Sequence, residues 1–550
     1  MTPIESKSKC ANSGAPPLIT QRMERELAAI ALSLGATQVR GWSADEQRLI
    51  SGLPKVPTCR IRDIREKIRH GEDPLGELFC LIRSPEIRRP AGATYTPKKI
   101  ISAMIAWAAS YAQPSRIVDP GAGSGRFLVA AGRKFKNSDL VGIELDPLAA
   151  LIARGHVAAA GLHHRAQIIL TDYRRALLPP ISGRTLYIGN PPYVRHHLLG
   201  TRWKNWLSVE SKRLRLTASQ LAGLHVHFFL ATTLAARPRD FGAFITAAEW
   251  LDVNYGKLVR DLFTGALGGQ NLVVIEPTAL PFPDAATTGV ITCFEKSSRP
   301  ARIKVWRVKS LGRLGKLNGG QPLRRERLES ESRWSHLTRR ANKPPSGFIE
   351  LGELCRVHRG QVTGSNSAWI VNEQSNHLPD SVKLATVTRA KELYAAGSAL
   401  DDTTSLRRVI DLPMDLDELD ERDRKEILQF LRRLRKLGVH QGYVAQNRKA
   451  WWSVGLKDPA PILATYMSRR PPAFVRNLVS ARHINIAHGI YPRDKMDEKT
   501  MGRLVRFLSR NICLKDGRTY AGGLTKFEPR EMERLVVPGP ELLRGAQPEW

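Results

Sequence analysis

The chain has 550 residues, with 85 Lys and Arg against 52 Asp and Glu, and a formal net charge of +33. This length predicts two or three domains. A basic excess spread along the chain predicts nucleic acid as a partner, although a well-solvated basic surface from an arginine-favouring genome gives the same composition. Six cysteines without a CxxC pair exclude an obvious zinc ribbon and indicate reduced thiols in a cytosol. We expect no signal peptide and no membrane span, since the apolar runs are too short.

Residues 1–88 are expected to form a basic, helical segment, with residues 22–34 and 61–70 as the clearer helices and no evident catalytic group. The pattern changes at Thr96, which suits an N-cap, and Pro97, which suits the first turn of an apolar helix at residues 100–111. A helix N-terminus beside a hydroxyl can bind a carboxylate. An ordinary capped helix explains the same residues, so both interpretations stay open.

Residues 116–131 are typical of a strand, a glycine turn and a helix. Gly121, Gly123 and Gly125 follow a GxGxG spacing, and no Gly-Lys-Ser/Thr comes after them. Both the dinucleotide fingerprint and the Walker A phosphate loop are therefore poor fits. Asp119 ends the strand at a point where a phosphate cradle would avoid negative charge. A ligand with a cationic end and no phosphate, such as S-adenosylmethionine, fits this turn better.

Three further apolar strands each end in a polar side chain. Glu144 ends the second strand, where a carboxylate would accept two ribose hydroxyls. Asp172 ends the third strand and is placed to accept from an adenine amine, and Asn190 ends the fourth. Strands that alternate with helices predict an α/β fold with a parallel, doubly wound sheet, in which ligands bind at the carboxyl ends of the strands.

Asn190-Pro191-Pro192-Tyr193 follows the fourth strand directly. Proline fixes φ and has no N–H, so the Asn190 side-chain oxygen and the Pro191 carbonyl form two rigid acceptors for one NH2 group while Tyr193 stacks on its ring. A proline-rich turn explains the four residues taken alone. More strands are expected at residues 242–247 and 272–275, and then a hairpin-like pair at 281–295. The histidines at 196, 197, 225 and 227 have no Cys or carboxylate at ligand spacing, so we expect no metal.

Beyond residue 300 the sequence becomes basic and irregular, with Trp306 and Trp334 interleaved. Basic residues with aromatic ones suit a surface that tracks phosphates, and a solvated linker has the same pattern. Residues 411–437 are expected to form a charged helix pair. Its Asp423-Arg424-Lys425 matches half of a nuclease site but is expected to be helix surface.

Taken in order, these motifs resemble those of the adenine-specific DNA methyltransferases of restriction-modification systems, in the gamma arrangement. The segments that carry the resemblance in the catalytic half are residues 92–97, 119–128, 142–146, 171–172, 190–193 and 282–284. Segments 359–364, 472–477 and 522–529 are similar to the recognition half. The resemblance implies a Rossmann-like methyltransferase domain at residues 89–300, after the helical segment 1–88. A mixed α+β target-recognition domain would follow at residues 301–550.

The resemblance also implies a role for each site residue. It assigns Thr96 to the methionine carboxylate of S-adenosylmethionine, Asp119, Gly121 and Gly123 to the cofactor loop, Glu144 to the ribose and Asp172 to the cofactor adenine. Asn190 and the Pro191 carbonyl would hold the target amine beside Pro192, and Tyr193 and Phe282 would stack on the base. Gly121-Ala122 is a mild departure from the Ala-Cys or Pro-Cys found in many relatives.

The function implied is methyl transfer from S-adenosylmethionine to the N6 amine of a flipped-out adenine in double-stranded DNA. The enzyme would be a monomer in the bacterial cytoplasm, associated with the nucleoid, and a separate restriction endonuclease is an optional companion. Two other functions stay open. The chain could methylate RNA or a protein glutamine, or it could be a DNA-binding specificity subunit without catalytic activity.

Overall fold

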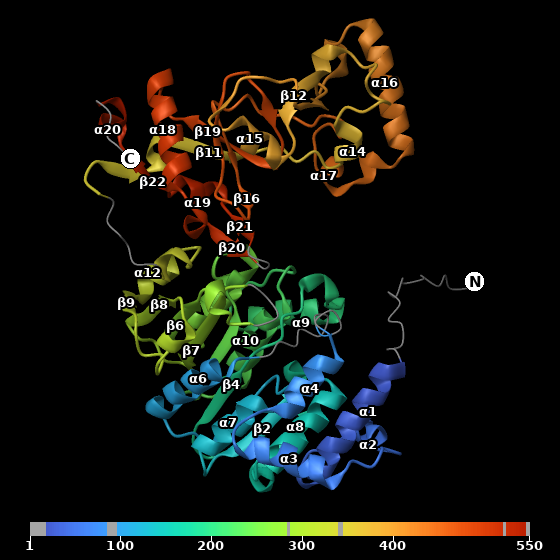
Figure 1. The fold of residues 1–550 in the computed structure, drawn as a ribbon, viewed down its shortest axis with the longest axis vertical. Helices are drawn as coiled ribbons and strands as arrows, with labels where there is room; N and C mark the ends of the chain where they lie inside the picture. Colours follow the sequence, from blue (N-terminus) through green and yellow to red (C-terminus); the bar gives the residue numbers. More distant parts are fainter. Residues whose placement is uncertain are drawn as a thin grey trace. The chain divides into compact units, whose positions relative to one another are not determined.

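The computed structural model describes residues 18–84, 88, 96–282, 287–338, 345–520 and 524–545. The chain divides into two compact units, residues 1–341 and 342–550 (Figure 1). Residues 92–95, 283–284 and 522–523, on which part of the family resemblance depends, lie outside the described residues.

The first unit is built on one large sheet, in which nine strands of the described chain are hydrogen-bonded in the order β3-β2-β1-β4-β5-β7-β6-β8-β9. The strands are β1 (Arg116–Asp119), β2 (Asp139–Glu144), β3 (Ala166–Leu170), β4 (Thr185–Gly189), β5 (Phe241–Ala247), β6 (Gly269–Ile275), β7 (Gly289–Glu295), β8 (Arg302–Val308) and β9 (Gln321–Arg324).

The sequence predicted a parallel sheet, but the sheet is mixed. Strands β3, β2, β1, β4 and β5 are parallel, whereas β7 runs antiparallel to both β5 and β6. The described part of the β6–β7 connection contains no α-helix. Parallel neighbours need a crossover, usually a helix, so a direct connection returns the chain as an antiparallel strand.

Helices cover both faces of this sheet, which confirms the doubly wound α/β fold. Side chains alternate across β4: Leu186 and Ile188 join the apolar core on one face, and Tyr187 joins the core on the other. The first core includes α6 (Lys98–Tyr111), α7 (Arg126–Lys134) and α8 (Pro147–Ala159), and the second includes α10 (Leu224–Ala235) and α11 (Lys257–Thr264). Two further helices of this unit are α9 (Thr201–Arg213) and α12 (Arg325–Ser330).

The N-terminal helices pack on the outer side of α8 (Figure 1). They are α1 (Leu18–Ser33), α2 (Ala44–Leu49), α3 (Thr58–Arg69) and α4 (Pro74–Ile82), so the helices predicted at residues 22–34 and 61–70 are present. Gly155 of α8 lies so close to α1 that a Cβ there would come within 2.7 Å of the Ala31 Cα. Helix α8 is thereby buried between the sheet and α1, and the N-terminal segment belongs to the first unit.

The sheet continues beyond residue 300, where the sequence predicted the start of the recognition domain. In β8, Ile303 and Val305 are buried while Arg302 and Lys304 are exposed, because one face of the strand covers the core. Trp334 is a core residue and not part of a phosphate-tracking surface: its ring packs 6.0 Å from that of Trp250, and its Nε1 donates to the Leu328 carbonyl at 2.9 Å. The predicted boundary therefore falls about two strands before the boundary between the two compact units.

The second unit mixes helices with small sheets, in agreement with the predicted α+β class. Its sheets have the strand orders β10-β22, β11-β19-β15-β17-β13, β14-β12-β18 and β16-β21-β20. The strands are β10 (Phe348–Glu350), β11 (Cys355–Arg359), β12 (Lys383–Val387), β13 (Ala399–Leu400), β14 (Arg407–Ile410), β15 (Ile462–Thr465), β16 (Met467–Ser468), β17 (Phe474–Asn477), β18 (Arg482–His483), β19 (Ala487–Pro492), β20 (Arg518–Tyr520), β21 (Leu524–Lys526) and β22 (Val536–Pro538). The helices are α13 (Leu351–Leu354), α14 (Asn366–Trp369), α15 (Ala390–Ala396), α16 (Glu421–Lys436), α17 (Tyr443–Gln446), α18 (Glu498–Asn511), α19 (Pro529–Glu533) and α20 (Pro540–Arg544).

Helix α16 replaces the charged helix pair predicted at residues 411–437. Its apolar stripe is buried, namely Ile427, Phe430, Leu431 and Leu434, while Asp423-Arg424-Lys425 lies in its first half. This agrees with the interpretation of those three residues as helix surface. In the described part of both units, we find no helix that is long and apolar enough to cross a bilayer.

Candidate active site

Asn190 stands at the carboxyl end of β4 and is hydrogen-bonded to two other residues predicted for the site, Thr96 and Tyr193. Its Nδ2 donates to Thr96 Oγ1 at 3.0 Å, and its Oδ1 lies 2.5 Å from the Tyr193 hydroxyl. That hydroxyl also lies 3.1 Å from the Ile245 carbonyl oxygen. Burial raises the pKa of Tyr193 well above its usual value, so the hydroxyl remains a neutral donor.

Tyr193 and Phe282 pack against each other at this site. Their ring centroids are 5.4 Å apart with the planes at 73°, an edge-to-face contact. Phe282 is 1% exposed and belongs to the core on the α6 side of the sheet. The two rings predicted to stack on a base are therefore adjacent and in mutual contact.

Thr96 differs from its predicted role as an N-cap. Helix α6 begins at Lys98 with Pro97 as its N-cap, and no side chain caps it. The Thr96 hydroxyl accepts from Asn190 instead, and its carbonyl accepts from Arg126 Nη1 at 2.9 Å. Thr96 thus connects Asn190 with Arg126 at the start of α7.

Asp119 ends β1 with a fully buried carboxyl group. One oxygen accepts from the Gly121 N–H at 3.2 Å, and Oδ2 has no hydrogen-bond partner among the described residues. Burial, together with the nearby Glu144 charge, raises the pKa of Asp119 to about 8. Buried carboxylate oxygens without a partner are rare and costly, so this atom suits the positively charged end of a ligand.

Glu144, the last residue of β2, is hydrogen-bonded to the glycine turn. It accepts from the backbone N–H groups of Gly123 at 2.7 Å, Leu145 at 2.8 Å and Asp146 at 3.0 Å. Burial raises the pKa of Glu144 in opposition to these hydrogen bonds. A carboxylate offers about four acceptor positions, so a position remains for a ligand hydroxyl.

The glycines of the turn leave room beside the Asn190-Pro191-Pro192-Tyr193 motif. Gly123 has φ +52°, and a Cβ at this position would meet no atom of the described residues within 4 Å. A Cβ on Gly121 would lie 3.6 Å from Pro192 Cδ. The predicted cofactor loop and the Asn190 motif therefore face each other across a short distance.

Asp172 is held by Arg174, a residue that the sequence did not single out. Oδ1 accepts from Arg174 N at 3.0 Å and Nε at 2.8 Å, and Oδ2 accepts from Nη2 at 2.5 Å. The guanidinium lies over the Trp203 ring, 3.5 Å from its centroid. Many sequences have an acidic residue two positions before an arginine, so the sequence alone does not identify this pair. In the structure, Arg174 fixes the carboxylate that is predicted to bind the cofactor adenine.

The histidines of α10 lie in the core. Burial lowers the pKa of His225 to about 4 and that of His227 to about 3. The His225 ring lies 6.4 Å from Tyr193, at the edge of its aromatic cluster. Within the described ranges we find no group of three His, Cys, Asp or Glu side chains suited to hold a metal ion.

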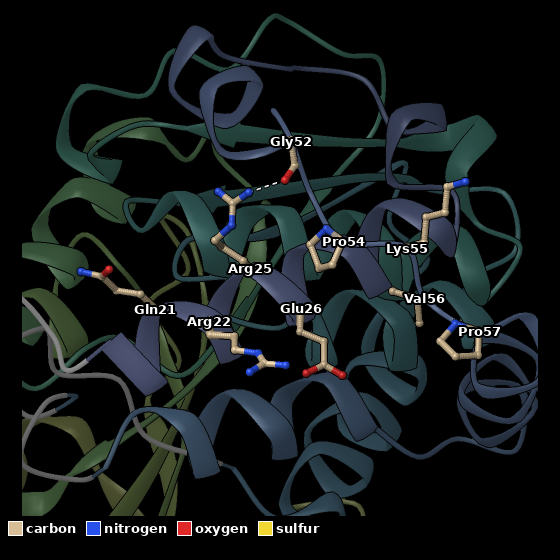
Figure 2. Close-up of a pocket in the computed structure, with 9 residues that line it drawn as sticks. All are labelled: Gln21, Arg22, Arg25, Glu26, Gly52, Pro54, Lys55, Val56 and Pro57. Atoms are coloured by element: carbon tan, nitrogen blue, oxygen red, sulfur yellow. Dashed lines mark hydrogen bonds between the residues drawn. The ribbon is translucent and has the colours of Figure 1, made fainter.

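A separate pocket of about 640 Å³ lies in the N-terminal segment (Figure 2). Its lining includes Arg22, Arg25 and Lys55, and the Arg25 guanidinium donates to the Gly52 carbonyl. It shares no lining residue with the strand ends described above, so it is distinct from the predicted cofactor and target-amine site.

Comparison with known families identifies both units. The N-6 DNA Methylase family model matches residues 79–215, which include the glycine turn and Asn190. The model of the C-terminal domain of Type II methyltransferase M.Eco57I matches residues 334–548, nearly the whole second unit.

Individual relatives match over most of the chain. The Type II methyltransferase M.XamI of Xanthomonas campestris pv. amaranthicola is 49% identical over 537 residues, 96% of this chain and 100% of that protein. Type II methyltransferase M.AccI of Acinetobacter calcoaceticus is 22% identical over 82% of this chain and 86% of its own length. Among solved structures, the Type IIL restriction-modification enzyme MmeI in complex with DNA has a TM-score of 0.52 at 12% identity, covering 88% of this chain and 83% of that one, which shows the fold.

Two findings determine the family. The identity to M.XamI extends over that protein's whole length, and the N-6 DNA Methylase model covers the motifs at the strand ends. The chain belongs to the adenine-specific Type II DNA methyltransferases of restriction-modification systems.

Proposed function

We propose that the first unit transfers a methyl group from S-adenosylmethionine to the N6 amine of an adenine flipped out of double-stranded DNA, at a sequence read by the second unit. The position of Asn190 carries this proposal. It stands at the end of β4, bonded to Thr96 and next to Pro192, which faces the glycine turn. A planar amine held there would lie beside a ligand on that turn.

The side chains around the turn fit S-adenosylmethionine. Asp119 Oδ2, which is buried and has no partner in the described part of the chain, suits the α-ammonium group. Glu144 and Asp172 each accept three hydrogen bonds from the protein and keep an acceptor position for a ribose hydroxyl and for the adenine amine. Thr96, beside Asn190, suits the methionine carboxylate end. When bound, the cofactor supplies an electrophilic methyl group.

The protein's task is to make adenine N6 nucleophilic, because its lone pair is delocalised into the ring. Asn190 Oδ1 and the Pro191 carbonyl accept the two N6 protons and hold the lone pair toward the methyl group. As the N–C bond forms and the bond between the methyl carbon and sulfur breaks, positive charge develops on the nitrogen, and the two fixed oxygens would stabilise it. The amine would then lose one proton to solvent to give the neutral N-methyl product, and no covalent enzyme intermediate is needed.

In this proposal, entry of the base shifts Tyr193. Its hydroxyl lies on Asn190 Oδ1, the acceptor that the target amine needs. Its ring and that of Phe282 touch edge to face, so a base that stacks on them must separate them. The new stacking then offsets part of the cost of extruding the base, a few kcal/mol.

The second unit is proposed to read the DNA sequence. Its match to the C-terminal domain of a Type II methyltransferase supports this, and a recognition unit of this size is not required for a short protein substrate. We propose that the enzyme acts as a monomer on chromosomal DNA in the bacterial cytoplasm, with a separate restriction endonuclease as an optional companion.

The test is transfer of labelled methyl from S-adenosylmethionine to unmethylated duplex DNA, with RNA and protein as parallel substrates. We expect transfer to duplex DNA by the wild-type enzyme and its loss in Asn190→Ala. Asn137→Ala is the matched control, since Asn137 is exposed in the turn before β2, at the opposite end of the strands. Transfer that survives Asn190→Ala, or that occurs on RNA or protein alone, would overturn the proposal.

A further inference from the structure

Asp73, in the N-terminal segment, contacts the turn proposed to bind the cofactor. It caps α4 through Oδ1, which accepts from the Gly76 N–H at 2.8 Å. Its Oδ2 accepts from Ser124 Oγ at 2.6 Å and from Arg126 Nε at 3.0 Å. Ser124 belongs to the glycine turn and Arg126 is the first residue of α7. The buried Asp73 carboxylate therefore holds both the end of the glycine turn, at Ser124, and the start of α7, at Arg126.

The same network extends to the catalytic motif. Arg126 Nη1 donates to the Thr96 carbonyl at 2.9 Å, and the Thr96 hydroxyl accepts from Asn190 at 3.0 Å. A continuous series of hydrogen bonds thus leads from Asp73 through Arg126 and Thr96 to Asn190. His156 of α8 adds support, with Nδ1 2.9 Å from the Ser124 carbonyl oxygen.

Asp73 is held in one position from several sides. It is 6% exposed. Burial alone would raise the pKa of Asp73, but the charges of His156 and Arg126 and the hydrogen bonds from Ser124 and Gly76 lower it, so the carboxylate is ionised. A Cβ on Gly76 would lie 2.2 Å from Asp73 Oδ2 and 2.8 Å from Ser124 Oγ. The backbone of α4 therefore lies so close to the carboxylate and to Ser124 that position 76 has no room for a side chain.

We propose that Asp73 is a positioning residue for methyl transfer: it fixes the glycine turn in the conformation that binds S-adenosylmethionine and orients Asn190 through Arg126 and Thr96. The N-terminal helical segment then forms part of the catalytic apparatus. This inference depends on the proposed role of the turn as the cofactor loop.

Asp73→Asn tests the proposal through the dissociation constant for S-adenosylmethionine, measured by calorimetry on the full chain without DNA. The variant keeps a cap for Gly76 but loses the charge that holds Arg126, so we expect cofactor binding to weaken about tenfold or more. Glu46→Gln is the matched control. It removes another buried carboxylate of the same segment, paired with Arg154 at 2.6 Å and 0% exposed, that has no bond to the turn. Its cofactor affinity should equal that of the wild type.

Ser124→Ala keeps the test decisive if Asp73→Asn fails to fold. It removes one hydrogen bond to Asp73 and leaves the ion pair with Arg126, so cofactor binding should weaken a few-fold. Added to Asp73→Asn, it should cause almost no further loss, because the two residues act as one unit. Wild-type cofactor affinity in the folded variants would overturn the proposal, as would an equal loss in Glu46→Gln. Failure of the proposed function looks different: the wild-type chain itself would not bind S-adenosylmethionine.

Discussion

The hydroxyl of Tyr193 lies 2.5 Å from Oδ1 of Asn190, the oxygen proposed to hold the target amine. In this structure the oxygen is therefore satisfied within the protein, and in the proposed function a base replaces this contact. Buried acceptors without a partner are costly, and the tyrosine removes that cost in the empty site. When a base enters, Asn190 Oδ1 exchanges its hydrogen bond with Tyr193 for one with the target amine, so this oxygen is hydrogen-bonded both before and after entry.

Two substitutions of Tyr193 distinguish the contribution of its hydroxyl to catalysis from that of its ring. Tyr193→Phe keeps the ring and removes the contact with Asn190, so we expect kcat/KM for DNA to stay within about tenfold of wild type. Tyr193→Ala also removes stacking, worth about 1–3 kcal/mol per base, and should lower kcat/KM by about 10–100-fold. Steady-state kinetics on a duplex that carries the recognised sequence measures both. A Phe variant as impaired as the Ala variant would contradict the stacking role.

The affinity for S-adenosylmethionine should rise with pH through the titration of Asp119. In the empty protein its pKa is raised to about 8, so the carboxyl group is largely protonated at neutral pH. A bound ammonium group favours the carboxylate, and binding then releases a proton. Affinity should increase by up to about tenfold per pH unit between about pH 6 and pH 8 and level off above that. Calorimetry in buffers of different ionisation enthalpy detects the proton, and Asp119→Asn should bind weakly without a pH slope.

The free energy of unfolding without cofactor should change with pH in the opposite direction to the cofactor affinity, because it depends on the same Asp119 carboxyl group. Its folded-state pKa of about 8 lies above its ordinary value, so the folded protein holds the proton more tightly than the unfolded chain. The wild type therefore loses stability as pH rises from about 4 to about 8. Asp119→Asn removes this loss and should be more stable than wild type at about pH 8, by about 1–3 kcal/mol. Urea unfolding at both ends of the range checks this, and a destabilised variant at the upper end would refute it.

A methyl group on Gly123 should block the cofactor and leave the protein folded. The new methyl group of Gly123→Ala meets no atom of the described residues within 4 Å, but the backbone there has φ +52°. Gly161→Ala, after α8, is equally open with φ +76° and serves as the control. Both should lose about 1–2 kcal/mol of stability from the left-handed backbone. Loss of S-adenosylmethionine binding is expected in Gly123→Ala alone, and equal binding by the two variants would place the cofactor elsewhere.

The predicted site residues are those whose side-chain chemistry coincides with the end of a strand, and their roles stay predictions. Asp119, Glu144 and Asn190 each follow an apolar strand, and parallel strands that alternate with helices bring such ends to one edge. The structure has these strands as β1, β2 and β4, which are neighbours in the sheet. The family comparison then confirmed the adenine-specific methyltransferase that the motifs resembled.

What the sequence missed depends on contacts between distant segments. Asp73 shows an N-cap pattern before Pro74, but nothing local indicates that its second oxygen reaches Ser124, 51 positions away. Strand β8 looked like a basic linker because its exposed face carries Arg302 and Lys304, which masked the alternation of Ile303 and Val305. The reversed direction of β7 follows from its connection to β6 and not from its residues.

The most direct test of the central claim is nucleoside analysis of duplex DNA after reaction with S-adenosylmethionine, for the wild type and for Asn190→Ala. If Asn190 and the Pro191 carbonyl hold the amine of a flipped adenine, the wild type yields N6-methyldeoxyadenosine as the methylated nucleoside and Asn190→Ala yields none above background. Methylated cytosine in its place, or N6-methyldeoxyadenosine at the wild-type rate from Asn190→Ala, would contradict the account.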